Sequence, residues 1–127
     1  MYIITGIWLQ EHAGVDIDFD RTGAIPVWRT AMCRHLFAGV VWNGTDGTLE
    51  GSMLDQVGTS ELSDIRLGGK TLTFTKKYSH RDDFIEYLFA KQSDGTWSGG
   101  YSGEACGAGK ARCIVTEAAD EFFAISN

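Results

Sequence analysis

The sequence lacks the features that a membrane-spanning or nucleic-acid-binding protein needs. No apolar run approaches the roughly 20 residues of a membrane helix, and the N-terminal segment has no positive charges of the kind that begin a signal peptide. Lys and Arg number 11 against 17 Asp and Glu, for a formal net charge of -6. A broad cationic surface for phosphate groups is therefore missing, and we expect neither a membrane nor nucleic acid among the partners.

Cysteine is scarce as well. Cys33, Cys106 and Cys113 are odd in number, and their spacing does not match a metal site. The three histidines are likewise far apart and have no partner at metal-ligand spacing. With no secretory signal in view, reduced thiols in a cytosol-like compartment are the simplest interpretation. We expect a cytoplasmic protein with no metal and no cofactor.

Proline is almost absent, with one residue against sixteen glycines. Together with many Thr, aromatic and β-branched residues, this glycine content indicates tight turns between strands. From Leu36 onward, stretches of strand-like sequence are separated by Asn-Gly, Gly-Gly and Asp-Gly pairs, which suit short hairpin loops. We predict an all-β fold, namely a single antiparallel up-and-down β-barrel of about 8–9 strands that forms one domain over residues 1–127.

The segment from residue 11 to residue 35 fits two structures. Val15, Ile17 and Phe19 alternate with three aspartates, as in a half-exposed strand. Further along, Trp28 and Met32 share a face at helical spacing, yet they also alternate as in a strand. We favour a strand here and keep a short helix between residues 25 and 36 as the alternative.

A glycine-rich stretch, YSGEACGAGKARC (101–113), invites comparison with a phosphate-binding loop. Such a loop has a glycine five residues before its Gly-Lys pair and Ser or Thr after the pair. Here Glu104 occupies the first of these positions and Ala111 the second. We therefore interpret the stretch as a connection between two strands. Because no catalytic Cys–His pair or carboxylate pair is marked by spacing either, we assign no catalytic residue and expect a binding protein rather than an enzyme.

The first predicted strand contains Gly6-Ile7-Trp8, a hairpin meander follows, and the last predicted strand carries Arg112. In these features the sequence resembles the calycin group of barrels, which comprises the lipocalins, the fatty-acid-binding proteins and the avidins. The resemblance implies that Trp8 lies at the closed end of the barrel, with Arg112 stacked across it in a cation–π contact. Fatty-acid-binding proteins hold a carboxylate with Arg-X-Tyr near the chain end, and Arg112-Cys113-Ile114 lacks that Tyr. The resemblance thus implies a fold with a cavity, and no particular ligand.

A barrel of about eight strands encloses room for one small ligand or for packed side chains. We predict that the barrel interior binds a small apolar or amphipathic molecule that bears an acid or carbonyl group. If Trp8 faces inward, the interior is also shared by Arg112 and by the residues expected to line the cavity. These candidate lining residues are Trp42, Met53, Phe74, Lys76, Tyr78, Tyr87, Phe89, Trp97 and Tyr101.

Two alternatives stay open. In the first, the protein is a barrel-type cyclase or isomerase that acts on a hydrophobic substrate and needs one acid or base. The residues that could supply it are Asp55, Lys76, Tyr78 and Tyr87. In the second, side chains fill the barrel, which then serves as an oligomerisation or protein-interaction module. The Thr- and Ser-rich segments 71–75 and 96–102 are flat enough for contact between the subunits of a homo-oligomer.

Overall fold

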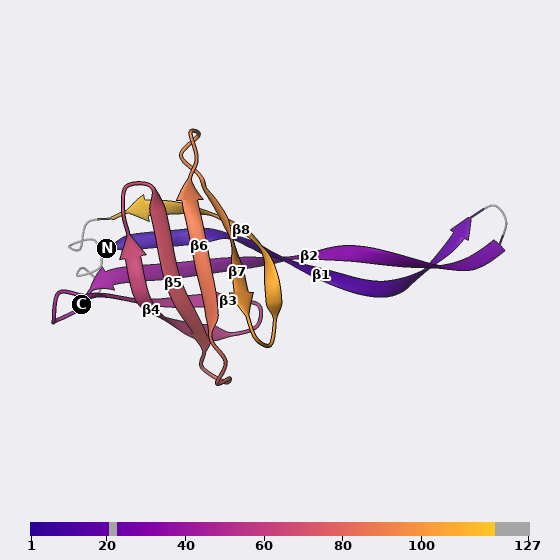
Figure 1. Cartoon of the computed structure of the whole chain (residues 1–127), viewed down its shortest axis with the longest axis horizontal. Coiled ribbons are helices and arrows are strands. Elements are labelled where there is room, and N and C mark those ends of the chain that lie inside the picture. Colours follow the sequence, from indigo (N-terminus) through magenta and orange to yellow (C-terminus); the bar gives the residue numbers. More distant parts are fainter. Residues whose placement is uncertain (21–22, 119–127) are drawn as a thin grey trace, which may run out of the picture.

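The chain forms a closed barrel of eight antiparallel strands in which each strand pairs with its neighbours in sequence (Figure 1). The computed structural model describes residues 1–20 and 23–118, and within them the side chains of residues 1–10 and 34–118. The strands are β1 (Tyr2–Asp20), β2 (Gly23–Asn43), β3 (Leu49–Asp55), β4 (Thr59–Leu67), β5 (Thr71–Tyr78), β6 (Ile85–Lys91), β7 (Trp97–Gly103) and β8 (Gly107–Glu117). The predicted all-β, up-and-down barrel is confirmed.

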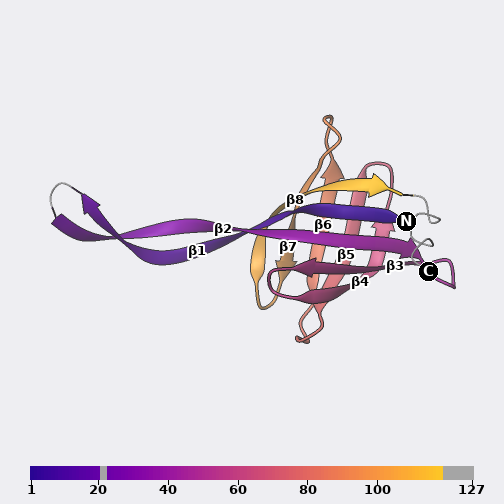
Figure 2. The same ribbon diagram turned by 180° about the vertical axis from the view of Figure 1, so that it is seen from behind.

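The first two strands are much longer than the barrel requires. β1 pairs with β8 only from Tyr2 to Trp8, and β2 pairs with β3 only from Phe37 to Asn43. The remaining residues of β1 and β2 pair with each other. They form a two-stranded arm that extends away from the barrel, as both ribbon views show (Figures 1 and 2).

The segment with two candidate structures is a strand. Residues 25–36 lie within β2, where they pair continuously with residues 18 to 7 of β1. Their backbone hydrogen bonds are therefore made between strands, and the helix alternative is wrong. Throughout the described part of the chain, we find no helix with the length and apolar character to cross a membrane.

Aromatic and aliphatic side chains fill the barrel. On β5 the even-numbered residues from Leu72 to Tyr78 are buried and the odd-numbered ones lie toward the outside, as the alternation of side chains along a strand requires. Phe74 and Tyr87 stack with ring centroids 4.9 Å apart. The other large hydrophobic side chains of the interior are Ile4, Trp8, Phe37, Val41, Met53, Leu62, Ile65, Ile85, Phe89, Trp97 and Tyr101.

The hairpin loops alternate between the two ends of the barrel. Loops 55–59, 78–85 and 103–107 lie at the end from which the arm leaves, which we call the arm end. The opposite end holds the other three loops, together with the start of β1 and the end of β8 (Figure 1). The arm end is the part of the barrel where polar side chains enter the interior.

Candidate functional site

An ion pair lies buried at the arm end of the barrel. The Nζ atom of Lys76 is 2.6 Å from Oδ2 of Asp55, and neither side chain is exposed to solvent. Strand alternation explains the placement, because Lys76 falls on the inward face of β5, and Asp55 ends the inward series of β3. A charged pair in this position is unusual, since charges leave water only at a large desolvation cost.

Asp55 is the centre of a hydrogen-bond network. Its Oδ2 atom accepts hydrogen bonds from the Tyr78 hydroxyl at 2.5 Å and from Nε1 of Trp8 at 3.3 Å, in addition to the Lys76 bond. Its Oδ1 atom accepts the backbone N–H groups of Val57 at 2.8 Å and Gly58 at 3.2 Å. A carboxylate has about four lone-pair positions, so Asp55 has none left to accept a proton from a substrate.

The electrostatics of the network keep Asp55 ionised. Burial acts to raise the pKa of Asp55, but the hydrogen bonds from Lys76 and Tyr78 and the charge of Lys76 hold that pKa below its ordinary value. Burial lowers the pKa of Lys76, against the opposing effect of Asp55. Burial and the neighbouring carboxylate raise the pKa of the Tyr78 phenol, which therefore remains a donor.

Aromatic rings surround the Lys76 ammonium group. Its Nζ atom lies 4.4 Å from the ring centroid of Tyr78, 5.6 Å from that of Tyr87 and 5.9 Å from that of Trp8. Each distance is within the range of a cation–π attraction. The rings therefore replace part of the hydration that Lys76 loses on burial.

Trp8 has a different ring partner from the one that the calycin resemblance implied. Its ring stacks on His35, with centroids 3.8 Å apart and planes inclined by 5°. Arg112 is exposed and pairs with Ile7, whereas Trp8 lies opposite Ala111 on β8. Because neighbouring residues of a strand point to opposite faces, Arg112 is on the outside of the barrel, and its predicted stacking on Trp8 is wrong.

A small cavity of about 100 Å³ lies at the arm end. It is partly open to solvent, with aromatic rings on one side and loop residues on the other. Its lining residues are Trp8, Gln10, Val57, Tyr78, Arg81, Ile85, Tyr87, Tyr101 and Cys106. Lys76 and Asp55 do not line the cavity, but both are bonded to or packed against rings that do. The cavity volume is below the roughly 150 Å³ of a dry cavity that binds benzene, so the cavity has room for a head group of a few heavy atoms.

The structure separates the predicted lining residues into three groups. Tyr78, Tyr87 and Tyr101 reach the cavity. Trp42 is half-buried on the outer side of β2, where its Nε1 atom donates to Glu50 at 3.1 Å, so its predicted inward position is wrong. The residues that pack into the interior without reaching this cavity are Met53, Phe74, Lys76, Phe89 and Trp97.

Several cavity residues were not identified from the sequence. Gln10 shares the inward alternation of Trp8, which is a signal that the pattern of β1 contained. Arg81 and Cys106 come from loops, where no periodicity applies. His35 is placed against Trp8 only by the pairing of β1 with β2. Across the residues described, no three His, Cys, Asp or Glu side chains are grouped so that they could hold a metal ion.

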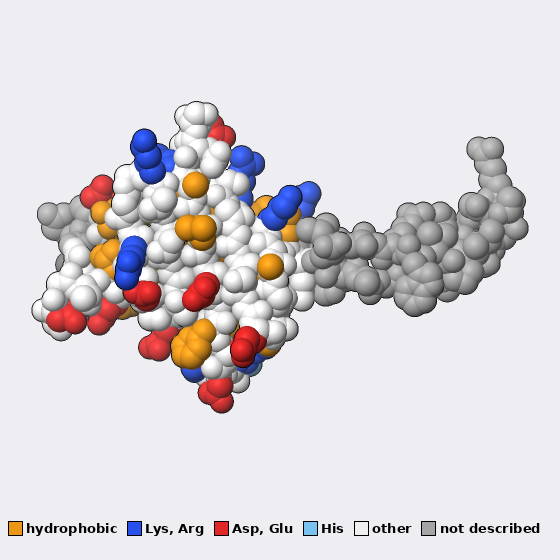
Figure 3. Space-filling model, in the orientation of Figure 1, with side chains coloured by type: hydrophobic (Ala, Val, Ile, Leu, Met, Phe, Trp, Pro, Cys, Tyr) orange, Lys and Arg blue, Asp and Glu red, His pale blue; other side chains and the backbone are white. Residues whose placement is uncertain are grey.

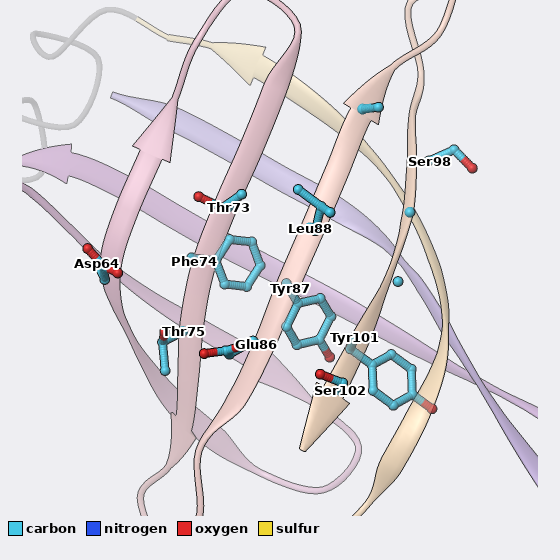
Figure 4. A pocket seen from close by; sticks show the side chains of 13 residues that line it. Asp64, Thr73, Phe74, Thr75, Glu86, Tyr87, Leu88, Ser98, Tyr101 and Ser102 are labelled. Carbon is cyan, nitrogen blue, oxygen red and sulfur yellow. The ribbon is translucent and has the colours of Figure 1, made fainter. Parts of the chain in front are cut away.

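A second hollow lies on the outer face of the barrel. It is a shallow groove of about 740 Å³ across β5, β6 and β7. In Figure 4, Leu88 and Glu86 of β6 lie between threonines of β5 and serines of β7, and Figure 3 shows this face of the molecule. The groove includes parts of the Thr- and Ser-rich segments 71–75 and 96–102, and Leu88 within it is 59% exposed.

No protein family, curated protein or solved structure was found to match this chain. The structure is an eight-stranded closed antiparallel barrel, which is consistent with a calycin-like fold.

Proposed function

We propose that this protein is a calycin-like barrel that binds a small apolar or amphipathic molecule at its arm end. The observation that carries the proposal is the buried Asp55–Lys76 pair directly behind the aromatic wall of a cavity. An apolar pair of similar volume is often at least as stable as a buried ion pair. Perturbed ionisable groups next to a cavity are therefore a sign of a binding or active site.

The size of the cavity limits the ligand. About 100 Å³ accepts a polar head group, and it is too small for a whole fatty acid or retinoid. Val57 and Phe84, which are both exposed in the loops of the arm end, offer apolar surface for the remainder of an amphipathic molecule. The ligand would thus be held by its head group inside and by its apolar part at the rim.

The cyclase or isomerase alternative has one observation in its favour. All four residues that the sequence suggested as acid or base, Asp55, Lys76, Tyr78 and Tyr87, meet in one cluster. Asp55 nevertheless has no free lone pair, and neither Asp55 nor Lys76 lines the cavity. A group that abstracts a proton must reach the substrate. Tyr78 and Tyr87 do line the cavity, but the raised pKa of both phenols keeps them protonated, so the cluster presents no base there and the geometry favours binding.

The interaction-module alternative has the outer groove in its favour, because the groove coincides with the segments expected to meet in a homo-oligomer.

As for the cellular location of the protein, we propose the cytoplasm. The two cysteines with described side chains, Cys106 and Cys113, are free thiols, as expected in a reducing compartment.

Binding can be tested with octan-1-ol, octan-2-one and octanoate, which share a chain and differ in the head group. We expect at least one of them to shift the indole signal of Trp8 and the backbone amides of Val57 and Gly58 in ¹H–¹⁵N NMR spectra, in a saturable way. Val57→Phe should fill the cavity and weaken this binding about tenfold or more, a loss of about 1.4 kcal/mol. Leu54→Phe is the matched control, because Leu54 is exposed on β3 and does not line the cavity. The proposal fails if none of the three compounds shifts these signals.

A further inference from the structure

Four aromatic side chains with a hydrogen-bond donor line the cavity at the arm end, and three of them already have a protein acceptor. The hydroxyl of Tyr78 and Nε1 of Trp8 both donate to Asp55. The hydroxyl of Tyr101 donates to the backbone carbonyl of Leu9 at 2.5 Å. These three groups hold the cavity wall together and are not free to bind a ligand.

Tyr87 differs from its neighbours. It lines the same cavity and is only 3% exposed, yet its hydroxyl has no hydrogen-bond partner within the described residues. Its ring is held on three sides, by Phe74, Phe89 and Tyr101, at centroid distances of 4.9, 5.9 and 5.6 Å. The hydroxyl is not among the fully buried polar atoms that lack a partner, which in the described residues are Nδ1 and Nε2 of His35, so it faces accessible space. A bound acceptor would give it a hydrogen-bond partner.

The charges around the cavity decide what kind of acceptor fits. Lys76 is paired with Asp55, and Arg81 is paired with Asp83 through Nε at 2.8 Å and Nη2 at 3.3 Å. Both cations therefore already have a carboxylate partner, and a bound carboxylate would place a third negative charge beside two positive ones, which is unfavourable. A neutral acceptor meets no such penalty.

The protonation state of Tyr87 agrees with this assignment. Burial and the nearby charge of Asp55 both raise the pKa of the Tyr87 phenol above its ordinary value. The phenol is therefore neutral at physiological pH and keeps the proton that it donates to a bound acceptor.

We infer that Tyr87 is the ligand-anchoring residue of the cavity and that the head group it binds is a neutral carbonyl, as in a ketone or aldehyde. This inference rests on the proposed binding function. It narrows the ligand class from acid or carbonyl to carbonyl, and it assigns the contact to one hydroxyl group.

The test compares octan-2-one with octanoate on the wild-type protein and on Tyr87→Phe. We expect the wild type to bind the ketone more tightly than the carboxylate, and the C=O stretching band of the bound ketone to move to lower frequency. Tyr87→Phe should weaken ketone binding about five- to tenfold, as the loss of one hydrogen bond predicts, and should abolish the band shift. Tyr2→Phe, which removes a hydroxyl at the opposite end of the barrel, should leave both measurements unchanged.

Two results would overturn the inference while leaving the binding function in place. One is octanoate binding that equals or exceeds ketone binding. The other is an unchanged ketone affinity and C=O frequency in Tyr87→Phe, provided that Val57→Phe still blocks the ketone. If the wild type binds neither compound nor octan-1-ol, the binding function itself fails, and the inference fails with it.

Discussion

At the scale of single residues, the most consequential feature is a carboxylate with five hydrogen-bond donors. Asp55 accepts bonds from three side chains and two backbone N–H groups, and these donors come from three separate segments of the chain. Each donor alone contributes modestly, but a buried network of this kind is stable only when all its members are satisfied. Removing one charged member is therefore expected to be costly.

We predict that Lys76→Met destabilises the protein by about 3–5 kcal/mol, because it leaves the buried charge of Asp55 without its cation. The measurement is the free energy of unfolding in urea. Lys77→Met is the matched control. Lys77 is the next residue and faces outward, so its change should stay within about 0.5 kcal/mol.

The double variant Asp55→Asn/Lys76→Met separates lost charge from lost packing. Because neither partner is then charged, its destabilisation should be smaller than the sum of the two single effects. Additive losses in this cycle, or a Lys76→Met protein as stable as the wild type, would contradict the role given to the ion pair.

At the scale of elements, Tyr101 stabilises the point at which β1 separates from β8. The β1–β8 ladder ends at the pair Trp8–Ala111. One residue further along β1, the carbonyl of Leu9 accepts the hydroxyl of Tyr101, which belongs to β7. The Tyr101 ring crosses β8 directly over Gly109, where a Cβ atom would overlap the ring. The absence of a side chain at Gly109 is therefore what lets β7 reach β1.

We predict that Tyr101→Phe costs about 0.5–1.5 kcal/mol of stability, the value of one hydrogen bond. Gly109→Ala should cost more, about 1–3 kcal/mol, because the new methyl group must displace the ring. Urea unfolding gives both values, and hydrogen exchange should show faster exchange for amides near the end of the β1–β8 ladder. Gly68→Ala is the control, since a Cβ atom there meets other atoms only at ordinary contact distances. Equal stabilities for Gly109→Ala and Gly68→Ala would rule out this explanation.

At the scale of the whole molecule, closure of the barrel depends on how closely β8 approaches β1. Gly6 lies opposite Cys113 in this pair. A Cβ atom on Gly6 would overlap the carbonyl oxygen of Arg112 and lie 2.7 Å from Cβ of Cys113. Of the residues that carry the calycin resemblance, Gly6 thus acts in closing the barrel and Trp8 forms part of the cavity wall, whereas Arg112 takes no part in either.

We predict that Gly6→Ala destabilises the protein by about 1–3 kcal/mol through overpacking at the closing pair. Cys113 reports on closure, because it is buried and burial raises the pKa of its thiol to about 12. It should therefore react slowly with a thiol reagent in the wild type and faster in Gly6→Ala, as followed by mass spectrometry of the peptide that contains it. Gly69→Ala, with open space around the added methyl group, should match the wild type. An unreactive Cys113 in Gly6→Ala would show that closure tolerates a side chain at residue 6.

Local sequence patterns predicted much of the fold. Alternation assigned the inward face of β5 correctly, and turn-forming glycine pairs separated the strands of the meander. The same approach placed Trp42 inside, although its neighbour Val41 is the buried residue. A shift of one residue moves every side chain of a strand to the other face, so a face assigned without a clear alternating pattern is easily inverted.

What the sequence determined by itself is therefore the local part of the structure: strand content, turn positions, and the set of aromatic and charged residues from which a site is built. Tertiary structure alone decided which of these residues meet. Asp55 and Lys76 are 21 positions apart, and Trp8 and Asp55 are 47 apart. Their contact depends on strand pairing and on closure of the barrel, which bring distant segments together at one end. Periodicity acts within a strand and carries no information about the register between strands. For that reason the cavity and the unpaired hydroxyl of Tyr87 can be recognised only in the folded molecule.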